Sequence, residues 1–240
     1  MKEKVKMSAK EKILRMVMIA LFCALAFAVM PLFRINVMFL TFDIKDAIIT
    51  IGGLLFGPVA ALVISAVTAL LEFITIGDTG LYGLLMDFVS SASFAVVAAL
   101  IYRFRRDLLG AVIGLLSAVV AMTVFMLGMN LIVAPLFAPE VYTREAVMAM
   151  LPTIILPFNL TKAVLNAALV LILYKPVSIA LRYARVKIAG ATMETKTTAD
   201  TKTNLLITIA GLALVAASLI LFFVILGGEA EWFVNLWAKE

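Results

Sequence analysis

Long runs of apolar residues without charged side chains decide what this chain can fold into. One of them, Leu205 to Leu226, carries no charged residue at all, and a helix of about 20 such residues crosses a hydrocarbon core of about 30 Å. Hydrophobic residues make up 65% of the 240 residues and charged residues only 15%, whereas soluble domains are about a quarter charged. The sequence therefore predicts an all-α, polytopic membrane protein.

The apolar runs predict seven helices. Gly57 and Pro58 separate the second from the third, because glycine favours the end of a helix and proline its first turn. A loop rich in apolar residues follows the first helix, and a long connection containing Pro135 and Pro139 is expected after the fifth. The expected helices are Lys12–Pro31, Ala47–Phe56, Val59–Ile76, Leu81–Tyr102, Leu108–Leu127, Val147–Lys175 and Leu205–Leu226.

These helices imply a simple domain organisation. The first six form one membrane domain. The polar composition of the segment that follows is typical of a flexible linker, which leads to the seventh helix. The expected parts are a basic tail at 1–15, a six-helix membrane domain at 16–176, a linker at 177–204, an additional transmembrane helix at 205–227 and an amphipathic tail at 228–240.

The basic residues are distributed unevenly between the two sides of this layout. Fifteen of the 20 lie in the amino-terminal tail, the turn after the fourth helix and the segment beyond the sixth. The opposite loops hold Arg34, Lys45 and Arg144. The positive-inside rule places the amino terminus in the cytoplasm of a multi-pass protein of the cell membrane. The net charge of +5 thus reflects the orientation of the chain in the lipid bilayer. No nucleic acid partner is expected.

Three polar residues interrupt the sixth helix. Asn159, Lys162 and Asn166 are spaced i, i+3, i+7, so they share one helical face. A lysine at the centre of a span costs about 2.5–3.5 kcal/mol, and such residues usually face the bundle interior. The stripe predicts a hydrogen-bonding wall for a ligand, which Asn130 at the outer end of the fifth helix could face.

The alternative is that these groups only tie helices together, with Lys162 paired to Asp87 or Glu72. Interhelical polar contacts of this kind are common, at about 0.6 kcal/mol each. Asp87 is interpreted as a structural or ion-pair partner rather than a ligand contact. Glu72 and Asp78 are expected to be solvated near the outer surface.

A small-residue stripe marks the first helix. Ala20, Ala24 and Ala28 recur at every fourth position, a spacing that lets another helix approach closely. The partner helix could belong to the same bundle or to another subunit. The single cysteine, Cys23, is expected to face lipid or to fill a packing gap.

Absent residue types exclude several functions. The chain has no histidine and one cysteine, which removes histidine-based catalysis, histidine metal sites and disulfides within the chain. It has no phosphate-binding loop of the G-x-x-x-x-G-K-[ST] type and no H-E-x-x-H or G-x-S-x-G motif. No enzymatic activity, metal or cofactor is expected.

Several blocks of the sequence resemble one family. "FLTFDIKDAIITIGGLLFGPVAAL", "IGDTG", "AMTVFMLGMNLIVAP" and "ILPFNLTKAVLN" are similar to the riboflavin-binding S components (RibU type) of energy-coupling-factor (ECF) transporters. The resemblance runs from Met16 to Tyr174 and is most specific at the P-F-N-x-x-K block. It implies a six-helix membrane subunit that binds a vitamin near the outer face.

The resemblance also implies a set of site residues. In that group the asparagine of the fifth-helix block and the asparagine and lysine of P-F-N-x-x-K hydrogen-bond the ligand, which carries over to Asn130, Asn159 and Lys162. The loop at 33–46 would cover the site, with Leu40 and Phe42 as apolar contacts. The stripe at 20, 24 and 28 would dock onto the membrane-embedded coupling (T) subunit, which sits on two ATPase subunits.

The expected function is therefore capture of riboflavin at the outer face and its release to the cytoplasm. Asp87 stands where relatives carry an amide, so another flavin such as FMN, or a different vitamin, is an alternative ligand. A ligand-free membrane scaffold is a third possibility. The seventh helix lies outside the six-helix pattern, and the sequence assigns it no role beyond an anchor.

Overall fold

The computed structural model describes residues 8–37, 40–77, 79–183 and 201–226. The expected tail at 228–240, most of the linker at 177–204, the first seven residues of the basic tail and Asp78 lie outside these ranges. The elements are α1 (Ala9–Val29), a 3₁₀ turn (Met30–Phe33), β1 (Ile35–Val37), β2 (Leu40–Phe42), α2 (Lys45–Phe56), α3 (Pro58–Thr75), α4 (Gly80–Phe104), α5 (Leu108–Phe137), α6 (Arg144–Met150), a π-helical segment (Leu151–Ile155), α7 (Leu156–Tyr183) and α8 (Thr201–Leu226).

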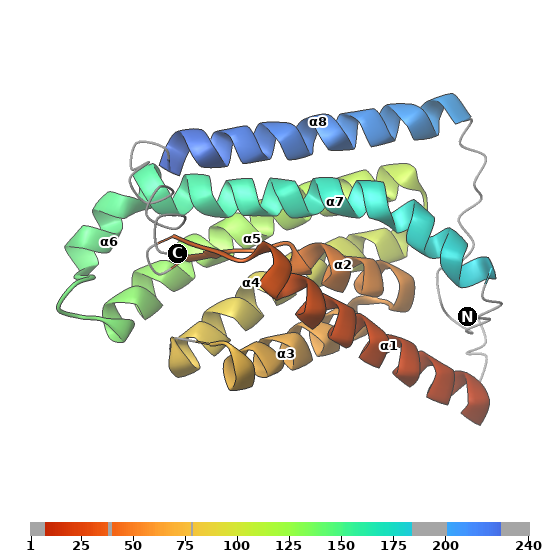
Figure 1. The fold of residues 1–240 in the computed structure, drawn as a ribbon, viewed down its shortest axis with the longest axis horizontal. Coiled ribbons are helices and arrows are strands. Elements are labelled where there is room, and N and C mark those ends of the chain that lie inside the picture. Colours follow the sequence, from red (N-terminus) through yellow and green to blue (C-terminus); the bar gives the residue numbers. More distant parts are fainter. Residues whose placement is uncertain (1–7, 38–39, 78, 184–200, 227–240) are drawn as a thin grey trace, which may run out of the picture.

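The helices form one bundle with α8 along its edge, which confirms the predicted fold class (Figure 1). Six helical segments of the described chain are long and apolar enough to cross a membrane. The helices α4 and α5 pack side by side, α3 packs on α4, and α7 lies between α5 and α8. Many large apolar side chains on the outer faces are exposed, as a lipid environment permits.

The helix α2 differs from the others because it is buried nearly all round. It has 12 residues, and only Ile48 among them is not fully buried. At about 18 Å it is shorter than the membrane, so it belongs to the core. Gly53 packs so closely on α3 that a Cβ atom would lie 2.7 Å from the Cβ of Ala61. The predicted break is confirmed: Gly57 ends α2 with φ 95°, and α3 begins at Pro58.

The predicted end of the fifth helix is wrong. The sequence interpretation ended it at Leu127, but α5 continues to Phe137 with Pro135 inside its last turn. A proline so close to the end removes little, because the helix continues only two residues beyond it and the Ala138 amide still bonds the Ala134 carbonyl at 3.2 Å. Asn130 therefore lies inside the helix rather than at its end.

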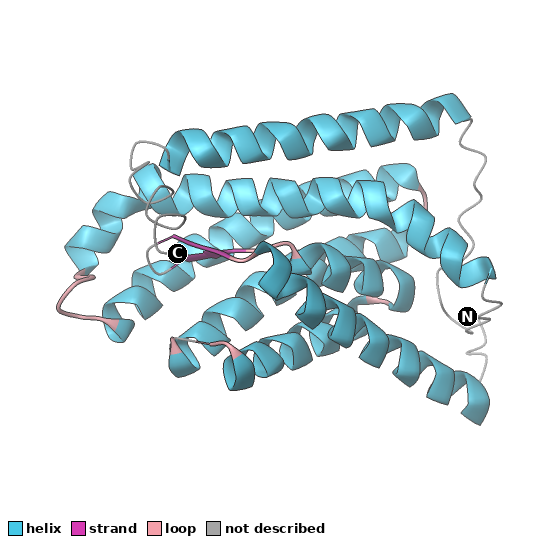
Figure 2. Ribbon diagram, viewed as in Figure 1, coloured by secondary structure: helices cyan, strands magenta, loops and turns pink. Residues whose placement is uncertain are grey.

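Two further details were not predicted. The expected sixth helix is divided into α6, the π-helical segment and α7. The loop after α1 contains an antiparallel hairpin in which Ile35 pairs with Phe42 and Val37 with Leu40. It is the one strand pair in the described ranges (Figure 2). We call the two strands, Ile35–Val37 and Leu40–Phe42, the β1–β2 hairpin.

Candidate functional site

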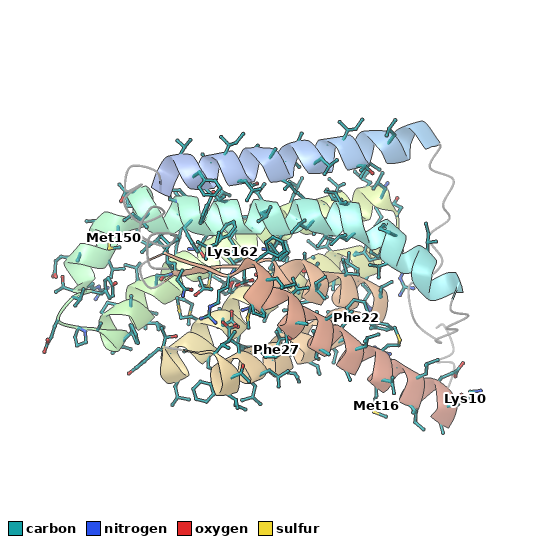
Figure 3. All side chains as sticks on the ribbon, viewed as in Figure 1. Lys10, Met16, Phe22, Phe27, Met150 and Lys162 are labelled. Carbon is teal, nitrogen blue, oxygen red and sulfur yellow. The ribbon has the colours of Figure 1, made fainter. Side chains whose placement is uncertain are left out.

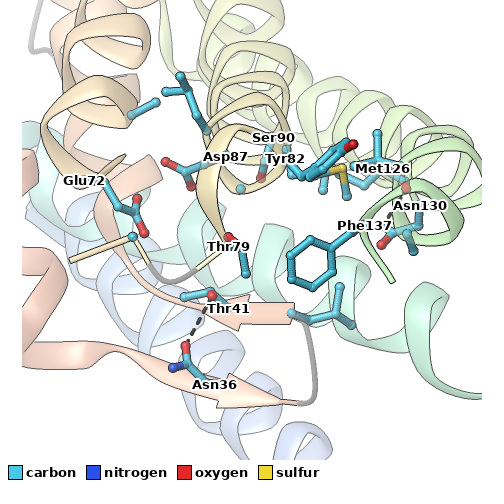
Figure 4. A pocket seen from close by; sticks show the side chains of 18 of the residues that line it. Asn36, Thr41, Glu72, Thr79, Tyr82, Asp87, Ser90, Met126, Asn130 and Phe137 are labelled. Carbon is cyan, nitrogen blue, oxygen red and sulfur yellow. Dashed lines mark hydrogen bonds between the residues drawn. The ribbon is translucent and has the colours of Figure 1, made fainter. Parts of the chain in front are cut away.

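A cavity of about 190 Å³ opens where the β1–β2 hairpin, α3, α4, α5 and α7 meet (Figure 4). Its wall combines apolar side chains with many polar and charged ones, among them Arg34, Glu72, Asp87 and Lys162. Of the expected ligand residues, Leu40, Asn130, Asn159 and Lys162 line this cavity. Phe42 does not line it, and packs instead against Phe158 of α7.

The two asparagines are buried and held by their own helices. The Asn130 amide donates from Nδ2 to the Met126 carbonyl at 2.7 Å, and Asn159 donates likewise to the Ile155 carbonyl at 2.8 Å. Ile155 is the last residue of the π-helical segment, an irregularity that often occurs at functional sites. An amide nitrogen has two hydrogens to donate, and each of these bonds uses one of them. The bond also fixes the orientation of the side chain.

Lys162 is 4% exposed and has two partners in the hairpin region. Its Nζ lies 2.9 Å from Oδ2 of Asp43 and 3.0 Å from the carbonyl oxygen of Thr41. Lys162 therefore forms an ion pair, as the alternative interpretation predicted, but its partner is Asp43 rather than Asp87 or Glu72. Burial raises the pKa of Asp43, but the attraction of Lys162 and Lys45 outweighs it, so this pKa lies below its ordinary value.

The predicted polar stripe on α7 is divided between two tasks. Asn159 and Lys162 reach the cavity, whereas Asn166 does not line it. The Asn166 side chain accepts from the Ala47 amide at 2.8 Å and donates to the Asp43 carbonyl at 3.1 Å. Asn166 therefore joins α7 to the start of α2 and supports the loop that carries Asp43.

A second buried lysine was missed. Lys45, expected in an outer loop, is fully buried, and its Nζ lies 2.6 Å from Oε2 of Glu72, 3.5 Å from Oδ2 of Asp43 and against Oδ1 of Asp87. The expectation that Glu72 is solvated is wrong, because its carboxylate lies in this network and also contacts Arg34 at 3.5 Å. Asp87 is an ion-pair partner, as predicted, and lines the cavity as well.

One signal in the sequence could have located Lys45. The helix that begins there has only 12 residues, too few to cross the membrane, so protein rather than lipid had to surround it. A charged residue in the first turn of such a helix needs a buried partner of opposite charge.

Three buried oxygen atoms on the cavity wall have no hydrogen-bond partner among the described residues. They are Oδ2 of Asp87, Oγ of Ser90 and Oδ1 of Asn130. An unsatisfied buried polar group costs about 1–3 kcal/mol, so each of these oxygens is a candidate acceptor for a hydrogen bond from a ligand. In the described part of the chain, no group of three histidine, cysteine or acidic residues is arranged to hold a metal ion.

The small-residue stripe lies on the outer face of α1. Ala20, Ala24 and Ala28 are exposed, while Phe22 and Ala26 on the opposite face are buried. The alanine face thus remains available to another helix. Cys23 is buried and fills the core, which decides between its two predicted positions.

Comparisons with known proteins agree with this geometry. The family model for the ECF transporter substrate-specific component matches residues 14–174. The riboflavin transporter RibU of Staphylococcus aureus (strain TCH60) is 27% identical over 171 residues, which cover 67% of this chain and 88% of that protein.

A solved structure, reported as the S component of a bacterial ECF transporter, is 28% identical with a TM-score of 0.58. The match covers 70% of this chain and 97% of the other. The matched range ends before α8, so this helix is additional to the common fold. The predicted range of resemblance, Met16 to Tyr174, coincides closely with the match. The chain belongs to the substrate-specific components of ECF transporters, a family of transport proteins rather than enzymes.

Proposed function

We propose that this protein captures riboflavin at the outer face of the cell membrane and releases it to the cytoplasm as part of an ECF importer. The observation that carries the proposal is the cavity wall, which combines Asn159 and Lys162 with three residues whose buried oxygens have no hydrogen-bond partner in the described part of the chain. Riboflavin offers ring N–H and ribityl hydroxyl donors to such oxygens. Its flat ring system suits the apolar remainder of the wall. The similarity to the S. aureus riboflavin transporter supports the same ligand.

The volume of the cavity bears on how the ligand enters. Its volume of about 190 Å³ is below the roughly 300 Å³ at which small-molecule pockets begin. A tricyclic ring therefore needs the surrounding loops to move apart. The β1–β2 hairpin is the natural moving part, because Leu40 and Thr41 line the cavity.

We infer the orientation in the membrane from the distribution of charge between the two ends of the bundle. Lys10 and Met150 lie at opposite ends, with Lys162 between them (Figure 3). The basic residues gather at the end of Lys10, which we assign to the cytoplasm, so the cavity faces outward. We further propose that the exposed Ala20, Ala24 and Ala28 dock onto the T subunit, and that the two ATPase subunits drive release through it.

The proposal is tested first by the absorbance and mass of any molecule that copurifies, and then by fluorescence titration with riboflavin. Quenching at nanomolar concentration, or about −12 kcal/mol, is expected. Asn159→Ala should weaken binding strongly. Thr153→Ala, an exposed residue of the neighbouring π-helical segment, should not. Equal affinity of both variants would refute the site, and a different copurified vitamin would refute the ligand.

A further inference from the structure

The helix α8 lies outside the range matched by the family model and packs antiparallel along α7 (Figure 1). Most of its described side chains are exposed. The buried or half-buried ones recur every three or four residues and form one narrow stripe, consisting of Ile207, Gly211, Val215, Ser218 and Phe222. Such spacing is typical of a helix that contacts protein on one face only. The contact is close at Gly211, where a Cβ atom would lie 2.7 Å from Ile172 of α7.

The last residue of this stripe reaches beyond α7 to the β1–β2 hairpin. Phe222 is 2% exposed, and its ring centroid lies 4.2 Å from that of Phe42 in β2 and 6.4 Å from that of Phe158 in α7. Phe42 and Phe158 in turn meet edge to face at 5.9 Å. These three rings, which we call the aromatic trio, are all buried. Phe222 is therefore a direct contact between the additional helix and the hairpin.

The aromatic trio adjoins the cavity on two sides. Leu40 and Thr41, which line the cavity, directly precede Phe42, and the Thr41 carbonyl accepts from Lys162 at 3.0 Å. Phe158 lines the cavity itself and precedes Asn159. The strand β2 is thus fixed by a hydrogen bond from Lys162 and by the packing of Phe42 on Phe222.

We propose that α8 holds the β1–β2 hairpin in its closed position through Phe222, which acts as a positioning residue for the ligand site. Without the ring of Phe222, Phe42 loses one of its two aromatic partners among the described residues. A void remains beneath β2, so the hairpin opens more often. Aromatic pairs contribute enough beyond their buried area to change the open population about 3- to 10-fold. Only the identity of the ligand rests on the proposed function; the hairpin's position does not.

The first experiment needs no ligand. Leu40 is 4% exposed, so Leu40→Cys on a Cys23→Ala background reports hairpin opening by its labelling rate with a maleimide. Phe222→Ala should raise that rate about 3- to 10-fold, and Phe222→Leu should raise it less. Ile220→Ala, a 64% exposed position two residues away, should leave it unchanged. Equal rates in the Phe222 variants and the parent would overturn the proposal.

The second experiment measures riboflavin release from the full chain by stopped-flow fluorescence. Phe222→Ala should speed release about 3- to 10-fold. The double variant Phe222→Ala with Phe42→Ala should release riboflavin no faster than Phe42→Ala alone, a result that a general loss of stability would not produce. Additive effects of the two substitutions on the release rate would contradict the contact. If riboflavin does not bind but labelling at Leu40→Cys still depends on Phe222, the proposed ligand is wrong and the role of α8 stands.

Discussion

The hydroxyl of Ser90 provides a test in which stability and affinity should change in opposite directions. Ser90 is 3% exposed, lines the cavity, and its Oγ has no partner among the described residues. Leaving such a group unsatisfied costs about 1–3 kcal/mol. Ser90→Ala removes that cost, and alanine is also the better helix former. We therefore expect the free energy of unfolding of the ligand-free protein to rise by about 1 kcal/mol.

The same substitution should weaken the ligand complex. A hydrogen bond contributes about 0.5–1.5 kcal/mol net, so the riboflavin dissociation constant should rise about 2- to 12-fold. Unfolding in detergent with and without riboflavin, together with fluorescence titration, measures both quantities on the same preparation.

A neighbouring serine provides the control. The hydroxyl of Ser93 donates to the Ser90 carbonyl at 2.9 Å, and Ser93 does not line the cavity. Ser93→Ala should lose stability slightly or not at all, and its affinity should be unchanged. If Ser90→Ala is less stable than the parent and binds riboflavin equally well, the hydroxyl has a partner within the protein and the reasoning from unsatisfied oxygens fails.

Three further predictions concern charge and backbone. Lys45→Met should lower the free energy of unfolding by about 3–5 kcal/mol, because it leaves buried carboxylates unpaired. Lys10→Met at an exposed position is the control. A loss below about 1 kcal/mol for Lys45→Met in thermal unfolding would contradict the network. Gly57→Ala should lower the free energy of unfolding by about 1–2 kcal/mol because Gly57 has a φ of 95°. Gly128→Ala, with no atom near its Cβ position, should not lower it. Equal stabilities of the two variants would argue against the break between α2 and α3. FMN should bind at least about tenfold more weakly than riboflavin, because its phosphate adds negative charge to a cavity that already has the carboxylates of Glu72 and Asp87 on its wall. Equal affinities measured by calorimetry would refute this.

Sequence reasoning located the elements whose signal is local. Apolar runs and the break at Gly57 predicted the helices and the membrane class, because each signal lies within one segment. The spacing of Asn159 and Lys162 was sufficient to place both on the cavity wall. The end of α5 was misplaced because Pro135 was treated as a helix breaker, although a proline in the last turn disrupts few bonds.

The missed features depend on distance along the chain. Lys45 meets Glu72 and Asp87 across 27 and 42 residues, and no local pattern encodes such pairings. The hairpin has strands of three residues each, too short for an alternating pattern to be recognised. Phe42 was assigned to the ligand because it lies in the covering loop. Its ring packs against Phe158 and Phe222, and Phe222 lies in a helix that the resemblance did not include.

The burial of α2 has a consequence for biosynthesis. A helix of 12 residues with two charged groups in its first turn cannot leave the translocon for lipid by itself, because nothing there neutralises Lys45 or Asp46. It must wait beside its neighbours until Asp87 has been synthesised, and the bond from the Ala47 amide to Asn166 forms only when that residue, 119 positions later, has been made. The binding cavity is therefore completed late, after most of the polypeptide has left the ribosome.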